Sequence, residues 1–115
     1  MAASHDIEVR VTFLGPEESG RSGPVRSGYR PTFHFNGMNW DANYVFPDVD
    51  EVGAGESARA YLEFLHASEI EKLLYEGMPF LIREGGRIMG YGAISKILSL
   101  AESAERQRRW SCDGT

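Results

Sequence analysis

The arginines are the side chains in this sequence with the most distinctive chemistry. Ten of its 12 basic residues are Arg and two are Lys, a bias toward planar groups that bind phosphate or carboxylate through paired hydrogen bonds. Three of them, Arg21, Arg26 and Arg30, lie between Gly20 and Phe35, where there is no acidic residue. This stretch is locally basic, with a net charge of +3, and chance clustering in a short chain is the alternative to a functional group of arginines.

Acidic residues gather in a different stretch of the chain. Residues 47–77 carry eight Asp and Glu against Arg59 and Lys72, a local net charge of −6. Asp48, Asp50 and Glu51 resemble a calcium-binding loop only loosely, because the spaced ligands and the central glycine of such loops are missing. The net charge of the whole chain is −5, which argues against binding nucleic acid through a general basic surface.

The sequence lacks the motifs on which most enzymatic sites depend. It has no GxxxxGK[ST] phosphate loop, so we expect no nucleotide cofactor and no GTPase activity. Its histidines are dispersed, at His5, His34 and His66, and none has the spacing of a metal site. We therefore expect a protein that is not an enzyme and that needs no metal or other cofactor.

Length and composition indicate one small globular domain. The chain has 115 residues, of which 42% are hydrophobic, enough for a core without disulfides or a structural metal. Cys112 is the single cysteine, which excludes a disulfide framework and fits a reducing compartment. The sequence has neither an apolar run of membrane-spanning length nor a signal pattern at its N-terminus. We expect a cytoplasmic protein that does not interact with membranes.

Hydrophobic residues alternate with polar ones in most of the chain, which is typical of strands with one buried face. The predicted strands are residues 7–13, 32–36, 38–46, 58–66, 79–84 and 87–98. The pairs Asn36-Gly37 and Gly85-Gly86 predict two-residue hairpin turns. A closed antiparallel barrel of six strands hides every sheet edge, and glycines such as Gly90 and Gly92 permit the bends that closure requires.

One internal segment is predicted to be helical. Ser68 and Glu71 form a capping box, Gly77 suits the C-terminal cap and Pro79 prevents continuation. This helix of about two turns must pack on the sheet, because it is too short to be stable alone. Residues 99–115 form a C-terminal tail, for which a frayed helix or partial disorder is expected.

Residues 15–30 form an unusually long connection between two predicted strands. They include four Gly and two Pro. Long ordered loops on rigid barrels are often functional. The alternative is a flexible surface loop without a function.

Two motifs carry a family resemblance. Residues 20–35, GRSGPVRSGYRPTFHF, and residues 80–92, FLIREGGRIMGYG, resemble the C-terminal domain, domain 3, of bacterial elongation factor Tu. The resemblance is strongest in GYRPxFxF and IREGGRxxGxG, and extends more weakly along residues 6–98. It implies an all-β fold, a six-stranded antiparallel closed barrel over residues 6–98, to which this sequence adds the one short helical insert predicted above. It also implies contacts with the T-stem of aminoacyl-tRNA and with the sister domains of the factor.

The resemblance also implies site residues. Glu84 and Gly85 match family positions that contact the T-stem, where a carboxylate can accept from a ribose hydroxyl and a glycine permits close backbone approach. A simple hairpin turn at these residues is the alternative. Other arginines of this sequence match arginines of the family. Some of them, above all Arg30 and Arg83, are expected to hold the long loop to the barrel through acids such as Glu84, and not to contact RNA or a partner. The predicted RNA-binding or partner-binding residues are Arg21, Arg26, Arg30, Glu84, Gly85 and Arg87.

The sequence also departs from the family at the expected tRNA contact. Thr32 stands where the family commonly has Gln, and Asp41 stands where it has Thr; a short hydroxyl reaches less far, and a carboxylate repels phosphate. The loop between His66 and Phe80 is longer and acidic. Two main functions are therefore expected: a binding module that contacts tRNA or a translation-associated protein, or a decoy that copies the factor's surface to bind a toxin, a modifying enzyme or an exchange factor. A degenerate remnant that keeps the fold is a third, and we expect a monomer.

Overall fold

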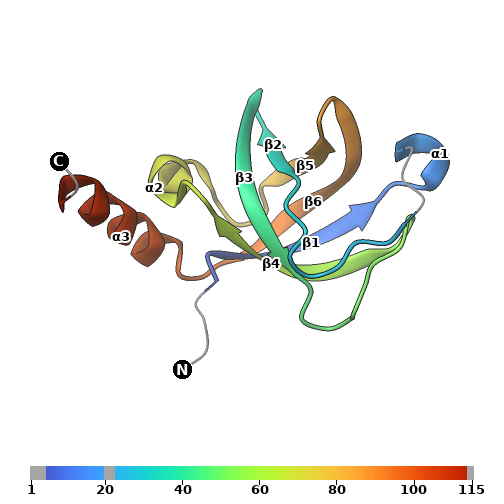
Figure 1. The fold of residues 1–115 in the computed structure, drawn as a ribbon, viewed down its shortest axis with the longest axis horizontal. Helices are drawn as coiled ribbons and strands as arrows, with labels where there is room; N and C mark the ends of the chain where they lie inside the picture. The colour runs from blue at the N-terminus through green and yellow to red at the C-terminus, as the bar shows by residue number, and fades with distance from the viewer. Residues whose placement is uncertain (1–4, 20–22, 114–115) are drawn as a thin grey trace.

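The computed structural model describes residues 5–19 and 23–113. Within these residues, strands and helices follow one another in an order close to the predicted one (Figure 1). The strands are β1 (Ile7–Phe13), β2 (Thr32–Phe35), β3 (Met38–Val45), β4 (Ser57–Phe64), β5 (Pro79–Glu84) and β6 (Arg87–Ile97). The helices are α1 (Pro16–Ser19), α2 (Ala67–Ile70), the 3₁₀ helix η1 (Glu71–Leu73) and α3 (Leu100–Asp113).

The strands close into an antiparallel barrel in the order β1-β4-β3-β2-β5-β6, with β6 returning to β1. The all-β barrel that alternation predicts, and that the resemblance to elongation factor Tu domain 3 implies, is confirmed. Closure gives every strand of the described chain a partner on both sides. Backbone donors and acceptors along the sheet are thereby satisfied without exposing an edge.

Alternation fills the barrel with apolar side chains. On β1, Ile7, Val9 and Val11 are fully buried, while the residues between them face outward. Aromatic rings occupy the centre: Phe33 stacks on Phe80 with ring centroids 4.4 Å apart. The buried faces of all strands therefore meet in one core. The residues between them face outward, where they are available for contacts with a partner.

Glycine permits the tight turns and the closure. At the turn between β2 and β3, Asn36 and Gly37 have φ values of 51° and 79°, the left-handed conformation that an Asn-Gly hairpin requires. At the closure between β6 and β1, a Cβ on Gly92 would lie 2.6 Å from the carbonyl oxygen of Arg10. Only glycine allows the two backbones to approach so closely.

The capping box expected at Ser68 and Glu71 is wrong. Helix α2 begins after His66, which makes no side-chain cap, and the backbone N–H of Ser68 donates instead to Oε1 of Gln107 on α3 at 3.0 Å. The helical segment ends at Leu73, because Leu74 is already extended. A residue distant in the sequence, rather than a local one, thus satisfies this helix terminus.

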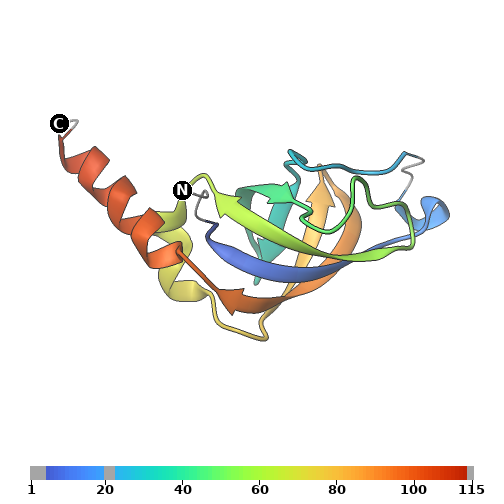
Figure 2. The ribbon, with the colours of Figure 1, turned by 90° about the horizontal axis from the view of Figure 1, so that it is seen from below.

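The tail contains helix α3, which packs against α2 at one end of the barrel, opposite α1 (Figures 1 and 2). Leu100 and Ala104 are buried in this contact. Of the two expectations for residues 99–115, partial disorder or a helix, the structure has a helix over Leu100–Asp113. Hydrophobic periodicity did not clearly predict this helix, because few of its residues are apolar and its main contacts with the rest of the chain, its anchors, are polar.

One of these anchors is Asp6, whose side chain is 2% exposed. One carboxylate oxygen accepts from the backbone N–H of Phe64 at 2.7 Å, and the other accepts from the hydroxyl of Ser103 on α3. The first strand, the end of β4 and the C-terminal helix are therefore joined at one buried acid. No helix in the described part of the chain is long and apolar enough to cross a membrane.

Candidate partner-binding face

Strand pairing brings Thr32 and Asp41 next to the glycine-rich turn. Thr32 on β2 is opposite Asp41 on β3 and, on its other side, opposite Arg83 on β5. The chain turns immediately after Glu84, with Gly85 at φ 59°. Asp41, Thr32 and Arg83 thus form one row across three strands, which ends beside the turn at residues 84–87. We call this row, with Glu84, Gly85 and Arg87, the contact row.

The long loop is fastened to the contact row by a tyrosine. The hydroxyl of Tyr29 donates to Oε2 of Glu84 at 2.5 Å, and Tyr29 also pairs with Tyr44 of β3 through an isolated bridge. A second bridge joins Val25 to Val52. The part of the loop that the structure describes is therefore an ordered layer on the barrel, and Tyr29 is a positioning residue that the sequence alone did not indicate.

The expected loop contacts of Arg30 and Arg83 are absent. Neither arginine forms an ion pair or a side-chain hydrogen bond with any residue that the structure describes, and Nε of Arg83 is buried without a partner. The expectation that they hold the loop through Glu84 is therefore wrong. The hydroxyl of Tyr29, the residue directly before Arg30, instead donates a hydrogen bond to Glu84.

Arg26 faces the acidic segment that follows β3. Its Nη2 lies 3.0 Å from Oε1 of Glu51, and both side chains are largely exposed. Exposed pairs of this kind contribute about 0–1 kcal/mol. The structure thus joins the basic loop and the acidic segment at this point, and it does not bring Arg26 into the contact row. Arg21 lies outside the described residues.

Arg87 begins β6 opposite Glu84 and is exposed. Its guanidinium forms no ion pair with the residues described here. The backbone of Gly85 is also exposed at this turn. Within the predicted set, Glu84, Gly85 and Arg87 therefore lie together, whereas Arg26 is placed elsewhere.

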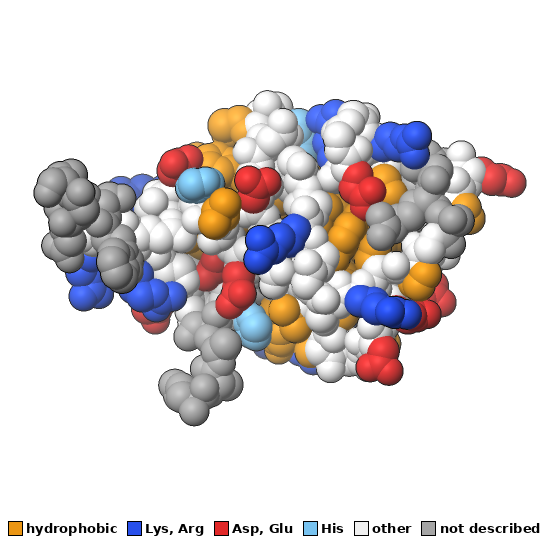
Figure 3. All heavy atoms as spheres, viewed as in Figure 1, with side chains coloured by type: hydrophobic (Ala, Val, Ile, Leu, Met, Phe, Trp, Pro, Cys, Tyr) orange, Lys and Arg blue, Asp and Glu red, His pale blue; other side chains and the backbone are white. Residues whose placement is uncertain are grey.

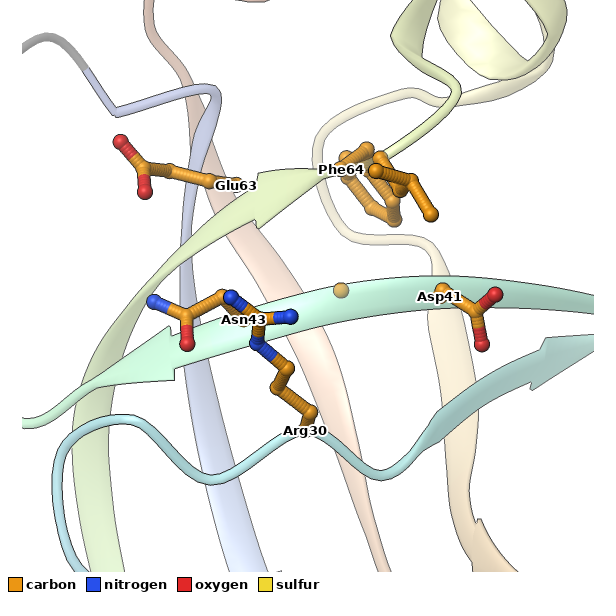
Figure 4. Close-up of a pocket in the computed structure, with 7 residues that line it drawn as sticks. Arg30, Asp41, Asn43, Glu63 and Phe64 are labelled. Carbon is orange, nitrogen blue, oxygen red and sulfur yellow. The ribbon is translucent and has the colours of Figure 1, made fainter.

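A pocket of about 210 Å³ adjoins the contact row (Figure 4). Arg30 rises from the loop toward Asn43, and Asp41 and Glu63 lie on the other sides of the opening. Its lining residues are Arg30, Asp41, Ala42, Asn43, Glu63, Phe64 and Leu65. Sequence reasoning missed Asn43 and Glu63, because only the register of β3 with β4 makes them opposite neighbours.

Charge is mixed rather than basic on the face of the molecule that Figure 3 shows. Figure 3 shows acidic and basic side chains interspersed over one face, without a continuous basic area. Arg59 illustrates this, since it binds both oxygens of Asp48, at 2.8 and 3.0 Å. Its hydrogen bonds lower the pKa of Asp48, which keeps that carboxylate ionised beside the barrel. Such a surface suits a partner with charges of both signs.

Metal coordination has no support in the described part of the chain, where no three His, Cys, Asp or Glu side chains converge. The acidic segment around Asp48 and Glu51 instead forms ion pairs with Arg59 and Arg26. Its carboxylates are engaged with guanidinium groups rather than directed toward one another.

A comparison with protein families identifies the domain. Residues 1–98 match the family model described as the elongation factor Tu C-terminal domain. The matched range contains the barrel, the contact row and the pocket, and ends just before α3. Since the match covers most of the 115 residues, the chain belongs to the elongation factor Tu C-terminal domain family.

Proposed function

We propose that this domain is a non-catalytic, cytoplasmic binding module that contacts a translation-associated protein through the contact row and the adjacent pocket. The observation that carries this proposal is the exposed Asp41, which stands in the row with Thr32 and Arg83. A carboxylate there repels a phosphate backbone but suits a protein surface that presents a basic side chain.

Two further observations support a protein partner. One arginine of the loop is already engaged within the protein, because Arg26 is paired with Glu51. The contact row also alternates in charge, with Asp41 and Glu84 among Arg83 and Arg87. Complementary mixed charge fixes register and partner choice between proteins. A protein that normally recognises the elongation factor surface, such as a modifying enzyme or an exchange factor, fits this description.

The test is capture from source lysate, with and without ribonuclease, followed by identification of both protein and RNA. We expect a protein that is retained after ribonuclease treatment and is lost with Asp41→Arg. Asp50→Arg is the matched control, because Asp50 is exposed and lies in the acidic segment, away from the contact row. Recovery of RNA alone, or equal capture by both variants, contradicts the proposal.

The second candidate is tRNA, and the turn at Glu84 and Gly85 favours it. This turn keeps the family's motif, exposes backbone at Gly85, and has beside it the guanidinium of Arg87, which forms no ion pair within the described part of the chain. A gel shift with aminoacylated tRNA at low and moderate salt measures this activity. If tRNA is the partner, binding is saturable and weakens both with salt and with Arg87→Glu.

Restoring the family residues separates the two candidates. The double variant Thr32→Gln with Asp41→Thr removes one negative charge from the row and lengthens the side chain at position 32. We expect it to bind tRNA more tightly than the natural protein and to capture less of the protein partner. Unchanged tRNA binding together with unchanged protein capture contradicts the role given to these two positions.

A further inference from the structure

The pocket beside the contact row is formed by outward-facing residues on two adjacent strands and one loop. Asn43 on β3 is opposite Glu63 on β4, and the backbone N–H of Leu65 donates to the carbonyl of Asp41 at 3.0 Å. Arg30 closes the side formed by the loop (Figure 4). The walls are thus held by backbone pairing, so the pocket exists before any ligand binds.

The polar side chains around this pocket have unused hydrogen-bonding capacity. None of the side chains of Arg30, Asp41 and Asn43 forms a hydrogen bond or an ion pair with another residue in the described ranges. Glu63 has a weak contact, with its carboxylate 3.9 Å from Nδ1 of His5. A guanidinium, an amide and a carboxylate therefore border one small cavity without side-chain partners among the residues that the structure describes.

The floor and rim add apolar surface. Ala42 and Phe64 are buried beneath the opening, whereas the side chain of Leu65 is 62% exposed at its edge. A leucine this exposed beside a cavity offers a surface for the aliphatic stem of a long side chain. At about 210 Å³, the cavity is smaller than the roughly 300–1,000 Å³ of sites for drug-sized ligands. It is suited to a single side chain.

The charges around the pocket favour a cation. Asp41 and Glu63 are two acidic lining residues against the single guanidinium of Arg30, so the lining has a negative formal charge. The two carboxylates lie at opposite ends of the opening, and that of Glu63 points away from Arg30 and Asn43 (Figure 4). The donors of Arg30 and Asn43, in turn, suit a neutral acceptor such as a peptide carbonyl. A cationic side chain followed by a backbone carbonyl satisfies both halves of the pocket.

We propose that this pocket receives an arginine side chain of the protein partner. The guanidinium of the partner pairs with the carboxylate of Asp41, its methylene stem packs on Leu65, and an adjacent backbone carbonyl accepts from Arg30 and Asn43. Planar guanidinium groups match a carboxylate through two parallel hydrogen bonds. This inference rests on the proposed function, because it specifies the chemistry by which the protein partner is recognised.

The experiment is an NMR titration of the purified, isotope-labelled full chain with N-acetyl-L-arginine amide. The matched probe is N-acetyl-L-citrulline amide, which has nearly the same shape but no charge. We expect saturable shifts of the Leu65 backbone amide and the Asn43 side-chain amide with the arginine probe, and weaker binding of the citrulline probe. Asp41→Asn should weaken binding of the arginine probe by up to about fivefold, the upper end of the range for an exposed ion pair, while Asp50→Asn leaves it unchanged.

Three results overturn the inference: no saturable shift at the pocket, equal binding of both probes, or equal affinities for Asp41→Asn and the natural protein. The titration contains no cellular partner, so its result does not depend on the result of the lysate capture. A negative titration beside Asp41-dependent capture of a protein removes only the arginine assignment. Capture of RNA alone removes the proposed function, whatever the titration shows.

Discussion

Among individual residues, Asp6 is a buried acid that connects distant parts of the chain. It is almost fully buried, and its two carboxylate oxygens accept from the Phe64 backbone and the Ser103 hydroxyl. Burial raises the pKa of Asp6, while the two hydrogen bonds oppose this effect. The residue thus joins three parts of the chain at the expense of holding a carboxyl group in an apolar environment.

Replacement of Asp6 should therefore be strongly destabilising when it removes the acceptors. Asp6→Ala leaves the Phe64 N–H without a partner, and we expect a loss of about 2–3 kcal/mol in the free energy of unfolding. Asp6→Asn should cost less, because its oxygen can accept from Phe64 while its amide donates to Ser103. Urea denaturation of both variants measures the difference. Equal losses in the two variants contradict the assigned geometry.

The raised pKa of Asp6 also predicts how stability depends on pH. Between its unfolded value of 3.8 and its higher folded value, the native state binds more protons than the unfolded state does. The free energy of unfolding therefore falls as pH rises through this window. Asp6→Asn lacks this component, so the natural protein should gain stability relative to the variant as pH decreases toward 3.8. Parallel pH profiles of their urea midpoints contradict this assignment.

At the scale of the element, the closure of β6 on β1 depends on glycine. A Cβ on Gly92 would lie 2.6 Å from the Arg10 carbonyl oxygen and 2.8 Å from a ring carbon of Phe80. We expect Gly92→Ala to lower the free energy of unfolding by about 1–3 kcal/mol, the usual range for overpacking. Gly86→Ala is the control, because its Cβ would have no neighbour within 4 Å. Chemical denaturation of both variants measures the contrast, and equal stabilities contradict the close packing.

The contact between helices α2 and α3 depends on the side chain of Gln107. The side chain of Gln107 accepts from the Ser68 N–H at 3.0 Å and donates to the carbonyl of Leu65 at 3.1 Å. Gln107→Ala should cost about 1–2 kcal/mol and speed amide exchange at Ser68, while core amides of β1 keep their protection relative to global unfolding. Arg109→Ala is the control, because its only ion pair in the described chain is an exposed one with Glu105 at 3.9 Å. Unchanged exchange at Ser68 contradicts the capping role.

At the scale of the whole molecule, barrel closure and mixed charge both favour an independent domain. Each strand in the described chain is paired on both sides, so no sheet edge is open to a second copy. We expect a monomer, with a mass near 12.8 kDa by light scattering throughout a dilution series. A concentration-dependent mass approaching twice that value contradicts this prediction.

Much of this architecture could be predicted from the sequence, because its cause is local. Alternation along residues 7–13 requires one buried face, and Asn36-Gly37 turns the chain wherever it occurs. These periods and turn residues determined the barrel, and the motifs around Tyr29 and Glu84 determined the family. Helix α3 was harder to predict, because Gln107 and Ser103 stabilise it through groups that are distant in the sequence.

The candidate site could be predicted from the sequence less completely than the fold could. The sequence alone places Thr32 and Arg30 in the motif GYRPxFxF and Glu84 in the motif IREGGRxxGxG. Only the strand register decided that Thr32 lies between Asp41 and Arg83, that Asn43 and Glu63 share a pocket with Arg30, and that Tyr29 holds Glu84. The physical reason is that periodicity determines which way a side chain faces, whereas its neighbours depend on which strands pair and in what register.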